Sequence, residues 1–442
     1  MGHPSIAVIA FALFQLVTAT LFLRPAELFS WLEEFPLYET LILGTFALTA
    51  TSVEPHFHWR ALARQPITLC AIGLLPAIAV SHLSHFYLGG VIESVPEFLK
   101  TLVYFSLVIT TVNTPSRLRA YLANVALCTT VMVVMCLLDY WGVIDFEFII
   151  PLEDHDGHDE EGQPIIVRRM RGTGIFMDPN DLSMVMVAGG VIALYFLFDE
   201  SLGGARWFWL FPLMAFAAAV LETESRGGLL AGFAAVVTLA CFRFGTKFAM
   251  VVGLLAFAAL PVVAGRAGNI SFGEDSTGHE RIEMWREGFA QLKSPNLIFG
   301  VGHNMYSDFA GLVAHNSFVH TYVELGIVGG TLFFGCWFFA ALQLYRMGRL
   351  PVPVWHPQLV RLRPYLGALL AGWCTSMMSL SRPYVVPTYM VIGVAAAYSN
   401  LVWIHTEVGQ PFVLWNKRSF WKLAGASAAA FVALYLFTVI AA

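Results

Sequence analysis

The chain has 442 residues, of which 57% are hydrophobic and 12% are charged, and its formal net charge is −5 at pH 7. It is too apolar for a disordered chain and too poor in charge for an ordinary soluble protein, in which about a quarter of residues are charged. Its 25 Lys and Arg residues stand against 30 Asp and Glu residues without a basic block, which argues against a nucleic-acid partner. The composition therefore predicts an all-α, polytopic integral membrane protein.

The first apolar stretch is predicted to be a spanning helix and not a cleaved signal. Met1 to Pro4 lead into it without a basic segment, and no small-residue cleavage site precedes Arg24. The six cysteines lie inside apolar runs without a paired spacing such as C-x-x-C, so they are interpreted as core or lipid-facing residues.

Apolar windows of spanning length recur along the whole chain. A helix crosses a hydrocarbon layer of roughly 30 Å with about 20 residues. Some windows are short or carry polar residues, so we expect about 12 transmembrane helices, or 13 if every window spans. The windows are 5–23, 36–53, 67–87, 98–113, 118–142, 181–199, 206–222, 227–243, 247–264, 317–346, 364–380, 384–404 and 420–441.

The distribution of Lys and Arg predicts the orientation, because cytoplasmic loops retain these residues. With the N-terminus inside, the short outer connections keep only Arg24, Lys100, Arg226 and Arg382. Two longer segments, 143–180 and 265–316, then fall outside. We therefore expect N-terminal transmembrane helices in 1–264, a periplasmic loop domain in 265–316 and C-terminal transmembrane helices in 317–442.

The second outer segment contains a predicted surface helix. Ile282, Trp285 and Phe289 recur at helical spacing, which is typical of an amphipathic helix lying at a membrane surface.

The first candidate site is Glu222-Thr-Glu-Ser-Arg-Gly-Gly228, at a junction between two apolar runs. The glycines allow a close backbone approach, and Arg226 could hold a phosphate through its planar fork of donors. The alternative is a tight turn whose arginine reaches lipid headgroups or pairs with Glu222 or Glu224.

Arg281, on the predicted surface helix, is the second candidate, because that helix would aim it toward the mouth of the bundle. The alternative is an exposed arginine that interacts weakly with Glu280, Glu283 or Glu287 at helical spacing.

The third candidate is His315, where an outer loop enters a spanning helix. A neutral imidazole there could accept a proton from a sugar hydroxyl near pH 7. The alternative is an interfacial histidine, with Asn316 or Ser317 as the helix cap. His303 and His320 compete for the role of base.

The acidic run 153–161 contains His155 and His158 and could in principle bind a divalent cation. Its spacing fits no defined metal site, and a solvated loop is the favoured interpretation.

Taken together, several motifs resemble the O-antigen ligase and polymerase superfamily over roughly residues 170–330. They are Gly172-Thr-Gly-Ile-Phe-Met-Asp-Pro-Asn-Asp181, Ser225-Arg-Gly-Gly228, Arg281 with Trp285, His315-Asn316 and Glu324-Leu-Gly-Ile327.

The resemblance implies a GT-C-like, inverting glycosyltransferase of the bacterial inner membrane, with its active site facing the periplasm. Its donor would be an undecaprenyl-pyrophosphate-linked glycan, its acceptor a lipid A-core sugar hydroxyl, and it would need neither metal nor cofactor. His315 then falls on the family's base, and Arg226 and Arg281 fall on its phosphate-handling arginines. Asp178, Asn180, Asn316 and His303 are expected to bind substrate.

Two sister activities stay open: an O-antigen polymerase, and an oligosaccharyltransferase that modifies protein hydroxyls from the same donor. A transporter or channel would need charges buried in mid-span, and few are present. The family's ligases commonly have 12 spans with both ends inside, whereas the windows counted here end outside.

Overall fold

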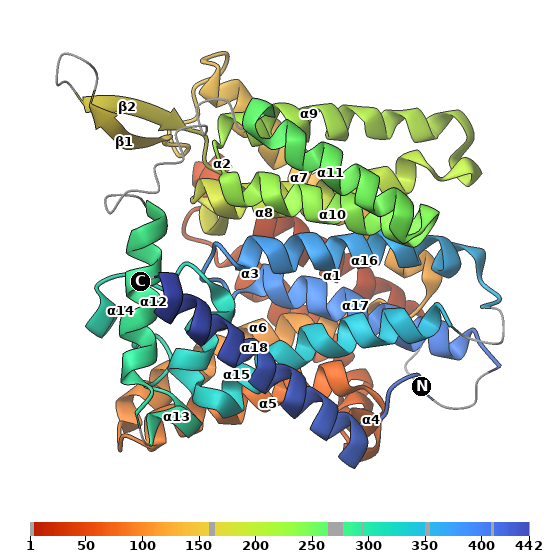
Figure 1. Ribbon diagram of the computed structural model, residues 1–442. Helices are drawn as coiled ribbons and strands as arrows, with labels where there is room; N and C mark the ends of the chain where they lie inside the picture. The colour runs from red at the N-terminus through yellow and green to blue at the C-terminus, as the bar shows by residue number, and fades with distance from the viewer. Residues whose placement is uncertain are drawn as a thin grey trace.

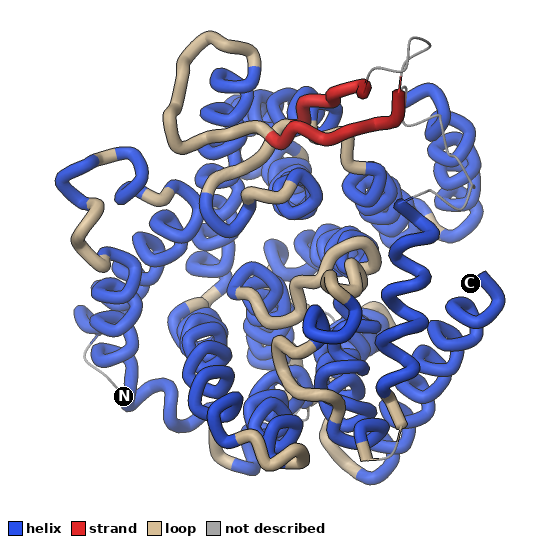
Figure 2. The backbone as a smooth tube through the Cα atoms, turned by 90° about the vertical axis from the view of Figure 1, so that its left-hand side faces the viewer, coloured by secondary structure: helices blue, strands red, loops and turns tan. Residues whose placement is uncertain are grey.

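A computed structural model of the chain describes residues 4–158, 164–263, 277–293, 295–349, 354–407 and 411–441. Helices make up nearly all of it (Figures 1 and 2). Nine helices in the described ranges are long and apolar enough to cross a membrane. The all-α, polytopic membrane class predicted from composition is therefore confirmed.

The candidate spans match the predicted windows closely. They are α1 (Pro4–Leu23), α5 (Pro66–Leu83), α7 (Pro115–Tyr140), α8 (Pro179–Leu197), η4 (Glu200–Trp209) continuing into α9 (Leu210–Glu222), α10 (Arg226–Phe244), α15 (Ser317–Met347), α17 (Val386–Ile404) and α18 (Lys417–Ala441). The remaining windows correspond to α3 (Leu37–Val53), α6 (Leu88–Thr111), α11 (Thr246–Val263) and α16 (Pro357–Met377), which pack against these spans.

Short helices connect the long ones. They are α2 (Pro25–Leu28), η1 (Ser30–Leu32), η2 (Glu54–His56), α4 (Trp59–Arg64), η3 (Gly174–Phe176), α12 (Thr277–Gln291), α13 (Asn296–Phe299) and α14 (Tyr306–Ala310).

The long helices run in a common direction, and α12, α13 and α14 gather at one end of the bundle (Figure 1). Figure 2 looks onto this end, which we call the loop face. The C-terminus lies at the loop face and the N-terminus at the opposite end (Figure 1). The termini are therefore on opposite sides, as the sequence windows predict.

The predicted amphipathic helix is present as α12, which runs across the ends of the long helices (Figure 1). Trp285 and Phe289 are buried, and the Phe289 ring contacts Phe431 and Tyr435 of α18. Because its apolar stripe is covered by another helix of the chain, α12 is held in a fixed position over the bundle.

The prediction of a solvated loop over residues 153–161 is wrong for its described part. Residues of β1 (Leu152–His158) pair in antiparallel fashion with β2 (Pro164–Arg169). The β-branched run Ile165-Ile-Val167 favours a strand, and Glu153 stands opposite Arg168, which is a favourable cross-strand pair. Residues 159–161, which complete the acidic run, lie outside the described residues.

Helix α15 is interrupted at Gly326, whose backbone adopts φ 64°. The interruption frees two carbonyl groups, and the loop before α14 takes them up: the N–H of Val301 donates to Val323 and that of Gly302 donates to Glu324, both at 3.0 Å. Freed backbone groups at membrane depth need such partners, because hydrocarbon supplies none. The Gly300-Val-Gly302 and Glu324-Leu-Gly326 motifs thus pack backbone against backbone.

Substituting alanine at Gly326 is expected to destabilise the protein by about 3 kcal/mol. A Cβ atom there would collide with the carbonyl group of Ile298, and an L-residue disfavours this φ. The measurement is the melting temperature of the purified protein in detergent. The matched control is Gly425→Ala in α18, where no atom stands near the added Cβ, and its melting temperature should not fall. Equal melting temperatures for Gly326→Ala and the unmodified protein would contradict this account of the break.

Candidate active site at the loop face

Two helix N-termini, those of α8 and α10, are joined by side-chain hydrogen bonds. Asp178 caps α8 by accepting from the N–H of Asn180 at 2.7 Å. Ser225 caps α10 by accepting from the N–H of Gly228 at 3.0 Å, and its Oγ donates to Oδ1 of Asn180 at 2.7 Å. Since helix N-termini carry partial positive charge, this junction favours a bound anion.

The glycines beside Arg226 are required by this packing. A Cβ atom at Gly227 would collide with Ser379, and one at Gly228 would collide with Ser183 of α8. Their absence lets α10 approach α8 and the segment after α16, which leaves Arg226 as the exposed first residue of α10. Within the described part of the chain, Arg226 forms no ion pair with Glu222 or Glu224.

Three arginines from separate elements act on one another at this junction. Burial lowers the pKa of Arg281, which α12 supplies, and the positive charges of Arg169 and Arg226 lower it further, whereas Asp178 raises it. Arg169 lies on β2, where its Nε donates to the carbonyl of Thr223 at 3.1 Å. Guanidinium groups that repel each other in this way create a site for a multivalent anion.

His315 lies beside these arginines in a strained backbone conformation, with φ 48°. Burial lowers its pKa, and the charges of Arg281 and Arg382 lower it further. The ring is therefore neutral at pH 7 and able to accept a proton. Because the side chain is only partly buried, a substrate hydroxyl group can reach it.

Arg382, in the segment that connects α16 to α17, also belongs to the cluster, because its charge lowers the pKa of His315. Its Nε lies 2.8 Å from each carboxylate oxygen of Asp181, which is buried at the start of α8. Its backbone N–H donates to Oγ of Ser317 at 2.9 Å, which fixes it against the start of α15. Arg382 is not recognisable as a site residue from the sequence, because its partner lies 201 positions away in the chain.

The other proposed residues have structural partners. Asn316 is fully buried and caps α15, accepting from the N–H groups of Phe318 and Val319 at 3.0 and 3.2 Å. His320 lies 3.1 Å from the buried carboxylate of Glu324. His303 is buried with its ring 4.4 Å from that of Tyr384, and burial lowers its pKa to about 4. Of the three competing histidines, His315 alone is both partly exposed and close to the arginines.

The described residues contain no group of three His, Cys, Asp or Glu side chains placed to hold a metal ion. The side chains of His155 and His158 lie outside the described residues. All six cysteines are free, and four of them are fully buried, in line with their interpretation as apolar residues.

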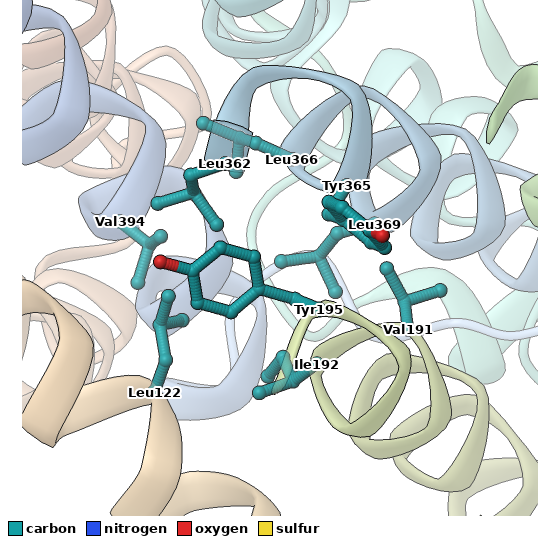
Figure 3. A pocket seen from close by; sticks show the side chains of 9 residues that line it. All are labelled: Leu122, Val191, Ile192, Tyr195, Leu362, Tyr365, Leu366, Leu369 and Val394. Atoms are coloured by element: carbon teal, nitrogen blue, oxygen red, sulfur yellow. The ribbon is translucent and has the colours of Figure 1, made fainter. Parts of the chain in front are cut away.

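One apolar cavity inside the bundle is too small for a substrate. It lies where Tyr195 of α8 meets Tyr365 of α16 and has a volume of about 10 Å³, enough for one water molecule (Figure 3). Leucine, isoleucine and valine side chains form the rest of its wall, so we interpret it as ordinary core packing.

The fold and the basic cluster define a polytopic membrane protein with a candidate anion-binding active site at one end of its bundle. Residues 211–334 match a family model described as O-antigen ligase, which supports membership of this family. No curated protein matches the sequence. The matched segment contains Arg226, Arg281 and His315, whereas Asp178, Asn180 and Arg382 lie outside it.

This match supports the resemblance found in the motifs. Enzymes of this family are of a glycosyl-transfer type and act in general on a lipid-linked glycan and an acceptor.

Proposed function

We propose that the chain is an O-antigen ligase that transfers a glycan from undecaprenyl pyrophosphate to a sugar hydroxyl of lipid A-core. The observation that supports this proposal is electrostatic: the charge of Arg226, at the capped N-terminus of α10, lowers the pKa of Arg281, and the charge of Arg281 lowers the pKa of His315. Both substrates are lipids, which suits a site at the end of a bundle of apolar helices. The distribution of Lys and Arg favours a periplasmic site in a bacterial inner membrane.

The leaving group sets the chemical demand on the site. Lipid pyrophosphate is a good leaving group, so the main task is to stabilise the negative charge that grows on its phosphate oxygens. Arg226 and Arg281 supply donors in a fork geometry that matches phosphate, and Arg169 adds positive charge nearby. No general acid is needed at the leaving oxygen.

His315 completes the reaction as the base. It takes the proton of the acceptor hydroxyl as that oxygen attacks the anomeric carbon, while the bond from this carbon to the pyrophosphate oxygen breaks. The electron pair leaves with undecaprenyl pyrophosphate. A single displacement of this kind inverts the configuration of the anomeric centre.

Deleting the gene separates ligase from polymerase. For a ligase, we expect uncapped lipid A-core and an accumulation of long, lipid-linked polymer, because chain growth continues without transfer. The measurement is gel electrophoresis of lipopolysaccharide and of the lipid-linked pool, with a plasmid-borne copy as the control. Core carrying only single repeats would instead identify a polymerase, and a normal core with under-glycosylated proteins would identify a protein oligosaccharyltransferase.

Transfer is expected to continue, within about twofold, when a chelator is added to purified enzyme with both substrates, because the guanidinium groups supply the charge stabilisation. The rate before and after EDTA treatment is the measurement. A loss of activity that added Mg²⁺ or Mn²⁺ restores would contradict the metal-independent mechanism.

A further inference from the structure

A second, larger cavity opens at the loop face, on the far side of the segment that carries Arg382. It has a volume of about 660 Å³, which is within the range for small-molecule sites. Its walls come from the end of α1, the segment 24–36, the starts of α3 and α17, and the outer part of α6. The mechanism described above does not use this cavity.

The cavity adjoins the candidate active site through two segments. The first connects α16 to α17: Arg382 faces Asp181, while Tyr384 and the two residues after it line the cavity. The second is the motif that precedes α8: Ile175 lines the cavity, and Thr173 donates to the carbonyl of Phe22 at the end of α1, at 3.1 Å. The cavity therefore shares two chain segments with the candidate active site.

The charge of the cavity is opposite to that of the arginine cluster. Four carboxylates line it against two cations: Glu33, Glu34, Glu39 and Glu97, with Arg24 and Lys100. The charge of Arg24 is already compensated, because its Nε lies 2.8 Å from the carboxylate of Glu27. A phosphate group is thus attracted to the arginine cluster and repelled by this cavity.

Polar and aromatic groups on the walls suit a sugar. Carboxylates accept hydrogen bonds from hydroxyl groups, and the rings of Phe35 and Tyr38 offer apolar faces for the C–H faces of a pyranose. Among the described residues, the hydroxyl of Tyr38 is buried and has no hydrogen-bond partner. Oxygen acceptors in such excess also favour an ammonium group, as in an amino sugar.

We infer that this cavity binds the acceptor, and that it selects a neutral or amino sugar over an acidic one. The inference rests on the proposed transfer function, since it assigns the two substrates to two neighbouring sites. The diphosphate of the donor occupies the cationic side, and the hydroxyl-bearing sugar of the acceptor occupies the acidic side.

The first test measures sugar binding without any transfer reaction. Purified protein in nanodiscs is titrated with the methyl glycosides of glucose, glucosamine and glucuronic acid, and saturation-transfer NMR gives their dissociation constants. We expect the glucuronide to bind at least about fivefold more weakly than the other two, from repulsion by the carboxylates. The double variant Glu39→Gln/Glu97→Gln should reduce this difference to less than about twofold.

The control is Glu54→Gln, which changes an exposed carboxylate beyond the opposite end of α3 and should leave the discrimination intact. Equal binding of the three glycosides to the unmodified protein would overturn the inference. Unchanged discrimination in the double variant, with its melting temperature preserved, would overturn it as well.

A second test assigns the cavity to one substrate. In a transfer assay with undecaprenyl-pyrophosphate-linked glycan and lipid A-core, the double variant should raise the KM for lipid A-core about tenfold and leave the KM for the donor unchanged. A rise in the donor KM alone would mean that the cavity holds the donor glycan, and would overturn the acceptor assignment. If no transfer occurs even with unmodified protein, the proposed function fails, and the binding series still decides whether the cavity selects sugars by charge.

Discussion

Replacing Arg281 with lysine is expected to lower the rate of glycan transfer by on the order of 10²-fold, similar to the loss of one oxyanion donor in other enzymes. Lysine keeps the positive charge but loses the planar fork that can bind two phosphate oxygens at once. Arg281 is half-buried and lies near Arg226 and Arg169, so the lost geometry is not easily replaced by water. The measurement is kcat for transfer to lipid A-core by purified, reconstituted protein.

Helix α12 provides a matched control in Arg286, which is exposed. Arg286→Lys should leave kcat within about twofold, because a solvated arginine contributes little. Arg226→Lys should behave like Arg281→Lys. Full activity in both cluster variants would mean that bidentate phosphate binding is wrong.

Replacing His315 with alanine is expected to lower kcat by about 10²–10⁴-fold, the usual contribution of a general base. In cells, lipid A-core should then stay uncapped while lipid-linked polymer accumulates. His279→Ala is the control, because it removes a histidine from α12 that is near Glu283 and outside the cluster. Normal capping by well-expressed His315→Ala protein would exclude this residue as the base.

The pH dependence of kcat follows from the environment of His315. Burial and the charges of Arg281 and Arg382 lower its pKa from 6.5, so the neutral, active form persists to lower pH than for a free imidazole. We expect kcat to be level through pH 7 and to fall only on acidification below pH 6.5. An acid limb centred above pH 6.5 would contradict the described environment.

Local sequence patterns were sufficient to predict the helices of this fold. Thirteen apolar windows correspond to thirteen long helices, and the spacing of Trp285 and Phe289 predicted α12. Such predictions succeed because the lipid or water around each helix determines its pattern of apolar residues, independently of the other helices. The hairpin of β1 and β2 was missed, because charged residues within a strand weaken its pattern.

The candidate site was only partly predictable, because its contacts join distant parts of the chain. Arg226 and His315 stood out as polar residues at the ends of apolar runs, and Arg281 as a cation on the predicted surface helix. The pairing of Asp181 with Arg382 and the charge of Arg169 near Arg281 depend on tertiary packing that no local pattern encodes. Asn316 is the opposite case. Its position beside the candidate base suggested a contact with substrate, whereas its side chain is buried and caps α15.

The most direct test of the central claim is a cryo-EM structure of the protein with undecaprenyl pyrophosphate bound. We expect the two phosphates to lie between Arg226 and Arg281, with guanidinium nitrogens about 3 Å from phosphate oxygens. The ring of His315 should lie beside the phosphates. A diphosphate bound at the opposite end of the bundle, or at the loop face beyond the reach of both arginines, would contradict it.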